Sequence, residues 1–246
     1  MHLYAGPLSL FSRKVEIALA EKAVAYTRTM VPFTQTKGYA PKNEAVLAAN
    51  PKGQVPVLVD GELTLYDSTV ILEYLEETHP KPALYPGNPG SRARCRIIEI
   101  EADEVLLEPV RRLMFRTEPP ADAALRAQQE IAAAEAQHLI ARNHERLDER
   151  LNGEAFLGEG YSVADIATFM VIHWSFLHRR EQTQYQAMSV QWQEWYNSVK
   201  QPGWPDTTFA TQHLLPQHIQ AELAVAHCEP STTVIDYKRE IHFEKT

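Results

Sequence analysis

The chain has 246 residues, of which 44% are hydrophobic and 23% charged, so it can form one large domain or two smaller ones with ordinary apolar cores. Its formal net charge of −8 argues against nucleic acid or an anionic membrane as the main binding partner. The two cysteines, Cys95 and Cys228, have neither metal-ligand nor CxxC spacing, which fits a reduced compartment. No apolar stretch approaches a membrane span, and the sequence predicts a cytoplasmic protein.

The first 49 residues alternate between short strands and helices. Val15, Ile17 and Leu19 follow the Gly6-Pro7 break and supply the buried face of a helix. The predicted elements are, in order, a strand at His2–Ala5, a helix at 9–23, a strand at 25–31, a polar loop at 33–41 and a short helix at 42–49.

The segment 50–80, NPKGQVPVLVDGELTLYDSTVILEYLEETHP, predicts a loop, two paired strands and a helix. Asp60-Gly61 lies between two short apolar runs and is a strong signal for a two-residue hairpin turn. Asp67 or Ser68 is a suitable N-cap for the helix, whose apolar residues recur at helical spacing.

Pro56 directly precedes the first of these strands, which indicates a cis peptide bond or an edge position with free backbone groups at Val55. The pattern N-P-x-G-x-V-P, then a hairpin, then an acidic residue and serine opening a helix, resembles the glutathione-binding half of cytosolic glutathione transferases. The resemblance covers residues 1–80. It implies an α/β thioredoxin-like N-terminal domain followed by an all-α C-terminal helical domain.

The resemblance assigns roles in binding glutathione. Val55, before the cis proline Pro56, would pair with the cysteinyl backbone of glutathione, and Asp67 with Ser68 would hold its γ-glutamyl group. Elementary chemistry agrees, because Ser68 and the free N–H groups of a helix start suit a carboxylate and Asp67 suits an ammonium. The alternative is that Asp67 and Ser68 only cap the helix.

The first turn, Gly6-Pro7-Leu8-Ser9-Leu10-Phe11-Ser12-Arg13, carries Ser9-x-x-Ser12 where redox proteins of the thioredoxin fold carry CxxC. Disulfide exchange through protein cysteines is therefore excluded at this place, and activation of a substrate thiol remains. A hydroxyl and a helix N-terminus together lower a thiol pKa by about one to two units. The segment is similar to the S-P-F-S-R-x-V signature of serine-type transferases, with Leu10 replacing the usual proline. Ser9 is accordingly the predicted catalytic residue, Ser12 a cap, and Tyr4 the competing donor.

Two further residues have roles implied by the resemblance. Lys42 aligns with a lysine that reaches the glycyl carboxylate of glutathione in plant-type serine enzymes. Gln54, beside Val55, is a candidate for the same end of the tripeptide.

The second half of the chain is predicted to be helical. Four prolines and two glycines make residues 80–90 a linker after a domain at 1–79, with a helical domain at 91–228 and a tail at 229–246. The predicted helices are 91–116, kinked at Pro109, then 122–151, 162–178, 190–199 and 206–223. The tail carries a strand-like patch at 232–235.

Tyr161-Ser162-Val163-Ala164-Asp165-Ile166 predicts a capping box with a hydrophobic staple. Ser162 is the N-cap, Asp165 reaches back to it, and Tyr161 packs on Ile166. Glutathione transferases open the central helix of their second domain with the same motif, so Asp165 is expected to act in folding.

The function predicted from these features is a glutathione transferase that uses glutathione as co-substrate against a small electrophile. Electrophile contacts are expected from Leu8, Leu10 and Phe11, and from Met114 on the 110–115 side of the first long helix. The family resemblance implies a homodimer, and no HExxH or other metal-ligand pattern occurs among the ten histidines. The serine–cysteine signature of the isomerase branch is missing at the first turn. The alternatives are a non-catalytic module of this fold that binds a protein partner and, less favoured, a thiol reductase.

Overall fold

The computed structural model describes residues 1–7, 9–33, 37–39, 42–117, 119–177 and 233–235. The chain forms two compact units, and each is considered by itself. The described part of the first unit lies within residues 1–82 and includes the distant strand 233–235. The described part of the second unit lies within residues 83–177.

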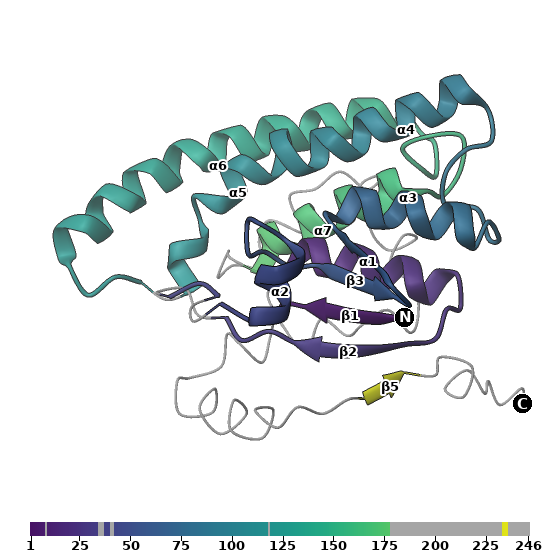
Figure 1. The fold of residues 1–246 in the computed structure, drawn as a ribbon. Coiled ribbons are helices and arrows are strands. Elements are labelled where there is room, and N and C mark those ends of the chain that lie inside the picture. Colours follow the sequence, from purple (N-terminus) through teal and green to yellow (C-terminus); the bar gives the residue numbers. More distant parts are fainter. Residues whose placement is uncertain (8, 34–36, 40–41, 118, 178–232, 236–246) are drawn as a thin grey trace, which may run out of the picture. The chain divides into compact units, whose positions relative to one another are not determined.

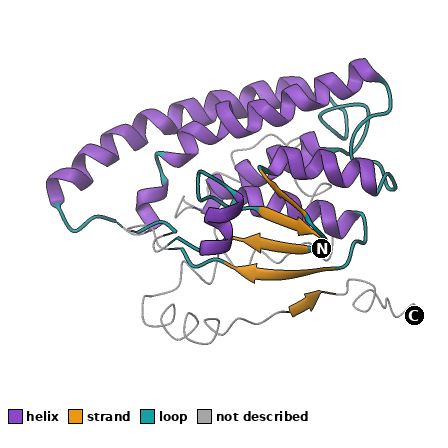
Figure 2. Ribbon diagram, viewed as in Figure 1, coloured by secondary structure: helices purple, strands orange, loops and turns teal. Residues whose placement is uncertain are grey.

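The first unit is a five-stranded sheet with helices (Figures 1 and 2). The strand order is β4-β3-β1-β2-β5; β1 runs parallel to β2 and antiparallel to β3. This arrangement confirms the predicted thioredoxin-like fold. The elements are β1 (His2–Ala5), α1 (Leu10–Glu21), β2 (Tyr26–Met30), α2 (Glu44–Ala49), β3 (Val57–Asp60), β4 (Leu63–Tyr66), α3 (Ser68–Thr78) and β5 (Thr233–Ile235).

The edge strand β5 comes from the far end of the chain. Val234 pairs with Thr27 of β2 in antiparallel register. The sequence indicated a strand-like patch here but gave no partner for it. The rest of the tail lies outside the described residues.

The hairpin turn differs by one residue from the prediction. Asp60 belongs to β3 and pairs with Leu63, so the two loop residues are Gly61 and Glu62 rather than Asp60 and Gly61. Gly61, the first loop residue, has φ +60°. Hairpin turns that need a positive φ at this residue favour glycine. The Tyr74 hydroxyl of α3 donates to the Oδ2 of Asp60 at 2.7 Å.

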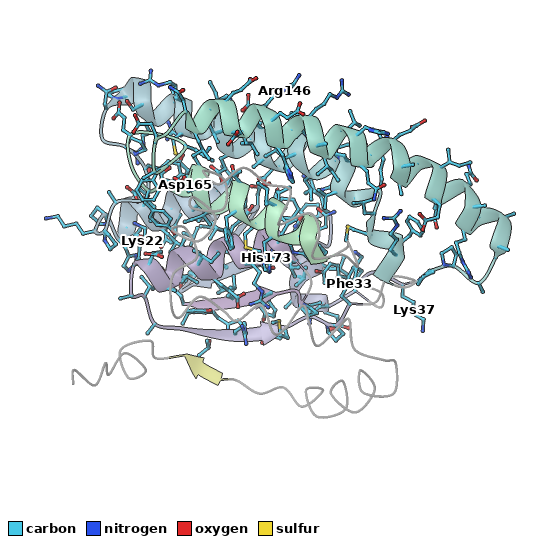
Figure 3. The ribbon with its side chains drawn as sticks, turned by 180° about the vertical axis from the view of Figure 1, so that it is seen from behind. Lys22, Phe33, Lys37, Arg146, Asp165 and His173 are labelled. Carbon is cyan, nitrogen blue, oxygen red and sulfur yellow. The ribbon has the colours of Figure 1, made fainter. Side chains whose placement is uncertain are left out.

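The end of α1 is joined to the end of α3 through Lys22 (Figure 3). The buried Lys22 ammonium donates to Glu76 Oε2 at 2.7 Å, to the carbonyl of His79 at 2.7 Å and to that of Pro82 at 2.8 Å. Three acceptors match the three N–H donors of an ammonium, so burial leaves no donor unsatisfied.

The second unit is helical in its described part, as predicted. It contains α4 (Pro89–Glu101), a π-helical turn (Ala102–Leu106), α5 (Leu107–Arg111), a 3₁₀ turn (Met114–Thr117), α6 (Ala123–Leu151) and α7 (Val163–Leu177). The segment from α4 to α5 packs against both α6 and α7.

The irregularity in the first long helix lies before Pro109 rather than at it. A proline ring clashes with the carbonyl four residues earlier, here that of Val105, and removes one helical N–H. Val105 belongs to the π-helical turn, and the N–H of Leu107 bonds to the carbonyl of Ala102, five residues back. The π-helical turn, which lies one turn before Pro109, therefore widens the helix enough to accommodate the proline ring.

Asp165 performs more than the predicted capping. Its Oδ2 accepts from the Ser162 N–H at 3.0 Å and from the Ser162 hydroxyl at 3.2 Å, and its Oδ1 accepts from the Leu157 N–H at 2.9 Å. Asp165 has no exposed surface. The carboxylate thus fixes both the start of α7 and the loop before it (Figure 3).

The predicted helices 190–199 and 206–223 lie outside the described residues, as does His178 at the predicted end of the third. The predicted domain boundaries stay predictions. Among the helices that the structure describes, none is both long and apolar enough to cross a membrane.

Candidate functional site

The first turn of the first unit is organised by two serines. Ser9 is the N-cap of α1, and its Oγ accepts from the backbone N–H of Ser12 at 3.1 Å. The Ser12 Oγ in turn accepts from the backbone N–H of Gly6 at 3.1 Å. Ser12 is fully buried and Ser9 is 9% exposed. The prediction that Ser12 is a cap is therefore wrong: Ser9 is the N-cap, and the Ser12 side chain instead holds the backbone of the loop at Gly6.

A tyrosine that sequence reasoning missed lies at the same turn. Tyr39 comes from the polar loop after β2, and its interaction with the Ser9 side chain acts in the direction that lowers the Tyr39 pKa. A Cβ at Gly6 would lie 2.0 Å from the Tyr39 hydroxyl oxygen, so only glycine leaves room for the phenol. The one feature of the sequence that could have identified Tyr39 as a site residue is its aromatic ring within a polar loop.

The Tyr39 ring is held by apolar neighbours. It packs against the cluster formed by Val31, Val46, Val55 and Val57, and its centroid lies 4.9 Å from that of Phe33, which Figure 3 labels. The Lys42 ammonium lies 5.9 Å from the ring centroid. Burial raises the pKa of Tyr39 to about 12, against smaller lowering effects of the Ser9 hydrogen bond and the Arg13 charge. The phenol is therefore protonated at neutral pH.

The Val55–Pro56 peptide bond is cis, one of the two possibilities that the sequence gave. Both residues are buried, and Val55 has no backbone hydrogen bond to any other described residue. Asn50 supports the preceding loop, since its Nδ2 donates to the carbonyl of Gln54 at 2.8 Å and its Oδ1 accepts from the Lys52 N–H at 2.9 Å. Asn50 stands in the quoted motif, but its supporting role was not foreseen.

The two residues predicted to meet the glycyl end of glutathione lie close together. Lys42 is exposed, and its ammonium donates to the carbonyl of Gly53 at 3.0 Å, next to Gln54. Gln54 is exposed as well. Their roles in binding stay predictions.

Asp67 and Ser68 begin α3. Asp67 is exposed, has φ +75° and caps the helix through Oδ1, which accepts from the Thr69 N–H at 3.0 Å. A positive φ at a residue other than glycine is uncommon and is a conformation met at ligand sites. Ser68 is 4% exposed, and its hydroxyl has no hydrogen bond to another described residue.

The predicted electrophile contacts belong to both units. Leu8 lies outside the described residues, and Leu10 is buried at the start of α1. Phe11 is partly exposed, with the Lys14 ammonium 5.5 Å from its ring centroid. Met114 is partly exposed in the 3₁₀ turn of the second unit. These assignments stay predictions.

Tyr4, the competing donor, belongs to β1. Its ring makes an edge contact with that of His2 at 4.8 Å and packs against the same apolar cluster as Tyr39. Within the described part of the chain, no group of three or more His, Cys, Asp or Glu side chains could hold a metal ion.

Comparison with known proteins identifies the family of this chain. A family profile described as "Glutathione S-transferase, N-terminal domain" matches residues 3–83. A probable maleylacetoacetate isomerase of Vibrio cholerae is 31% identical over 169 residues, which are 67% of this chain and 76% of that protein. The crystal structure of a glutathione S-transferase from Rhodospirillum rubrum superposes with a TM-score of 0.65 at 28% identity, covering 89% of this chain and 97% of that one. The chain belongs to the glutathione S-transferase family.

A second group of relatives is similar over a shorter stretch. A stringent starvation protein A homolog of Coxiella burnetii is 42% identical over 98 residues, which are 40% of this chain. The match covers 44% of that relative, so the chain spans less than half the length of the first curated relatives it matches.

Proposed function

We propose that the protein is a glutathione transferase, which binds glutathione on its first unit and activates the thiol for attack on a small electrophile. The observation that best supports this function is the hydrogen bonding of Ser9. Its Oγ accepts from the Ser12 N–H, and this cap bond does not need the single hydroxyl proton. That proton can be donated to an anionic sulfur, which the N-terminal end of α1 also favours.

Other residues of the first unit supply groups that suit the rest of the tripeptide. Val55 presents a backbone without partners among the described residues, beside the cis peptide bond to Pro56. Asp67 and Ser68 offer an exposed carboxylate and a hydroxyl at the start of α3. Lys42 and Gln54 supply polar groups for the glycyl carboxylate.

Capture on immobilised glutathione, calorimetry and a panel of electrophiles test this function. Retention, saturable heats and turnover of at least one electrophile support it. The panel should include aryl and alkyl halides, activated alkenes, a peroxide and an aryl ether. It should also include maleylacetoacetate, because three of the relatives are named as isomerases, or probable isomerases, of that compound. Absence of any binding to glutathione would overturn the proposal.

The second candidate is a non-catalytic module that binds a protein partner. The observation that favours it is the similarity to proteins named stringent starvation protein A homologs, a name that states no enzymatic reaction. Binding of glutathione without any lowering of its thiol pKa would favour this candidate. A lowered thiol pKa favours the enzyme, since a module that only binds a partner has no use for a thiolate.

We further propose a homodimer in the cytoplasm. Each unit has exposed apolar side chains on adjacent turns or strands. They are Tyr66 and Val70 at the end of β4 and the start of α3, and Ile97, Ile100 and Val105 on α4 and the π-helical turn. Packing of one set against the other set on a second copy would bury both.

A further inference from the structure

The backbone of Val55 carries two buried hydrogen-bonding groups without a partner. Val55 is 7% exposed, and neither its N–H nor its carbonyl bonds to another described residue. Buried backbone groups of folded proteins nearly always have a partner, so these two are set for a ligand or for water. The direction in which they point decides what they can bind, and the preceding loop fixes that direction.

This loop closes around the side chain of Asn50. Asn50 is 3% exposed, and each of its polar atoms is hydrogen-bonded. Its backbone N–H donates to the Val46 carbonyl at 2.8 Å, and its carbonyl accepts from the Gly53 N–H at 2.7 Å. Its side-chain Oδ1 accepts from the Lys52 N–H at 2.9 Å, and its Nδ2 donates to the Gln54 carbonyl at 2.8 Å. One side-chain amide therefore holds both the start and the end of the loop.

The bond to the Gln54 carbonyl also sets the direction of the Val55 N–H. The peptide bond between Gln54 and Val55 is trans, because the cis bonds in the described part of the chain both precede prolines. In a planar trans peptide the carbonyl and the N–H point to opposite sides. Because Asn50 holds the carbonyl within the loop, the N–H of Val55 points out of the loop.

The carbonyl of Val55 is expected on the same side as its N–H. Val55 precedes Pro56, and the residue before a proline favours extended backbone. An extended residue presents its N–H and its carbonyl together to one neighbouring strand, which is the arrangement of an antiparallel pair. A single residue of an extended peptide can therefore occupy both groups.

We propose that Asn50 is a positioning residue for glutathione, whose side-chain amide holds the Gln54–Val55 peptide so that Val55 can pair with the cysteinyl backbone of the tripeptide. The inference rests on the proposed function and extends it by one residue. Asn50 itself touches no part of the ligand in this arrangement. Its loss should weaken binding but leave unchanged the thiol pKa of bound glutathione, which depends on Ser9.

Asn50→Asp in the full chain isolates the amide donor. The carboxylate keeps an acceptor for the Lys52 N–H but cannot donate to the Gln54 carbonyl. Calorimetry should show glutathione bound about 5- to 50-fold more weakly, and KM for glutathione should rise by a similar factor. At saturating glutathione, kcat and the thiol pKa should keep their wild-type values, which a general loss of structure would not allow.

Asn43→Asp is the matched control, since it makes the same chemical change at the N-cap of α2. There the side chain needs only an acceptor for the Val46 N–H, at 3.2 Å, and the carboxylate retains one. This variant should bind glutathione like the wild type.

A change in the ligand tests whether the effect passes through Val55. In an ester analogue of glutathione, an oxygen replaces the cysteinyl N–H that would donate to the Val55 carbonyl. The wild type should bind this analogue about 2- to 10-fold more weakly than glutathione. In Asn50→Asp the backbone pairing is already lost, so the two ligands should bind alike.

The outcomes separate this role from the proposed function. If the wild type does not bind glutathione, the proposed function fails and the role of Asn50 fails with it. If the wild type binds glutathione and Asn50→Asp binds it equally tightly, only the inference is wrong. An undiminished penalty for the ester analogue in the variant would show that the loss does not pass through Val55, which also overturns it. Where a thermal melt shows Asn50→Asp to be unfolded, Asn50→Ala, which introduces no charge, takes its place in the same comparisons.

Discussion

The backbone N–H of Ser12 donates to the side-chain oxygen of Ser9 over 3.1 Å at the start of α1. This bond gives Ser9 two separable roles. Its oxygen caps the helix, whereas its proton is available for donation to a ligand.

Ser9→Ala should lower the rate of the chemical step at neutral pH about 10- to 100-fold, because a thiol pKa raised by one to two units leaves that much less thiolate. Glutathione affinity should change little. The lost cap should cost about 0.5–2 kcal/mol of stability. Single-turnover reaction of bound glutathione with a chlorodinitrobenzene measures the step. Ser9→Thr keeps both the cap and the hydroxyl and should retain most of the rate; equal loss in both variants would contradict the role of the hydroxyl.

Ser68→Ala should weaken glutathione binding by about 1–3 kcal/mol, since a carboxylate of the ligand would lose a hydrogen bond in a buried position. Isothermal calorimetry measures this. Asp67→Asn is a companion variant that keeps an oxygen for the Thr69 N–H but removes the charge. It should preserve the melting temperature and weaken binding. If both variants bind glutathione with wild-type affinity, Asp67 and Ser68 act only at the start of the helix and not in binding.

Asp165→Ala should destabilise the protein by about 2–4 kcal/mol, because it leaves the buried N–H groups of Leu157 and Ser162 without their acceptor. Urea unfolding measures the loss. Asp122→Ala removes an exposed cap of α6 and should cost less, about 0.5–2 kcal/mol. Normal stability with lost activity in Asp165→Ala would instead mark a catalytic acid.

Gly6→Ala should destabilise the first unit by about 1–3 kcal/mol, because the new Cβ would lie 2.0 Å from the Tyr39 hydroxyl and 2.9 Å from Val55 Cγ2. It should also weaken thiol activation, because the Gly6 N–H donates to Ser12, whose own N–H positions Ser9. Thermal melting and the thiolate titration measure the two effects. Gly87→Ala is the matched control, since no atom lies within 4 Å of a Cβ there. Equal behaviour of the two variants would argue that Tyr39 does not cover Gly6.

Light scattering at micromolar concentration should give about twice the chain mass of 27.9 kDa. Val70→Asp combined with Ile97→Asp should shift the mass toward the monomer, because it places charges on both exposed apolar sets. Ile131→Asp on α6, also at an exposed isoleucine, should leave the dimer intact. A wild-type mass near 28 kDa would rule out the dimer.

The sequence alone determined the features that depend on neighbours along the chain. The order of strands and helices in the first unit and the start of α3 at Asp67 and Ser68 follow from short runs of consecutive residues, and Pro56 limited its preceding bond to two possibilities, of which the structure has the cis form. Such features are set by local backbone preferences and by the first free N–H groups of a helix, which a sequence pattern carries directly.

Only the tertiary structure decided the contacts between residues far apart in the chain. Tyr39 reaches Gly6 from another loop, and Val234 pairs with Thr27, which lies near the other end of the sequence. The widened turn before Pro109 likewise depends on where the chain absorbs the missing N–H. No local propensity encodes these choices, because each is made when packing brings distant segments together and every buried polar group must find a partner.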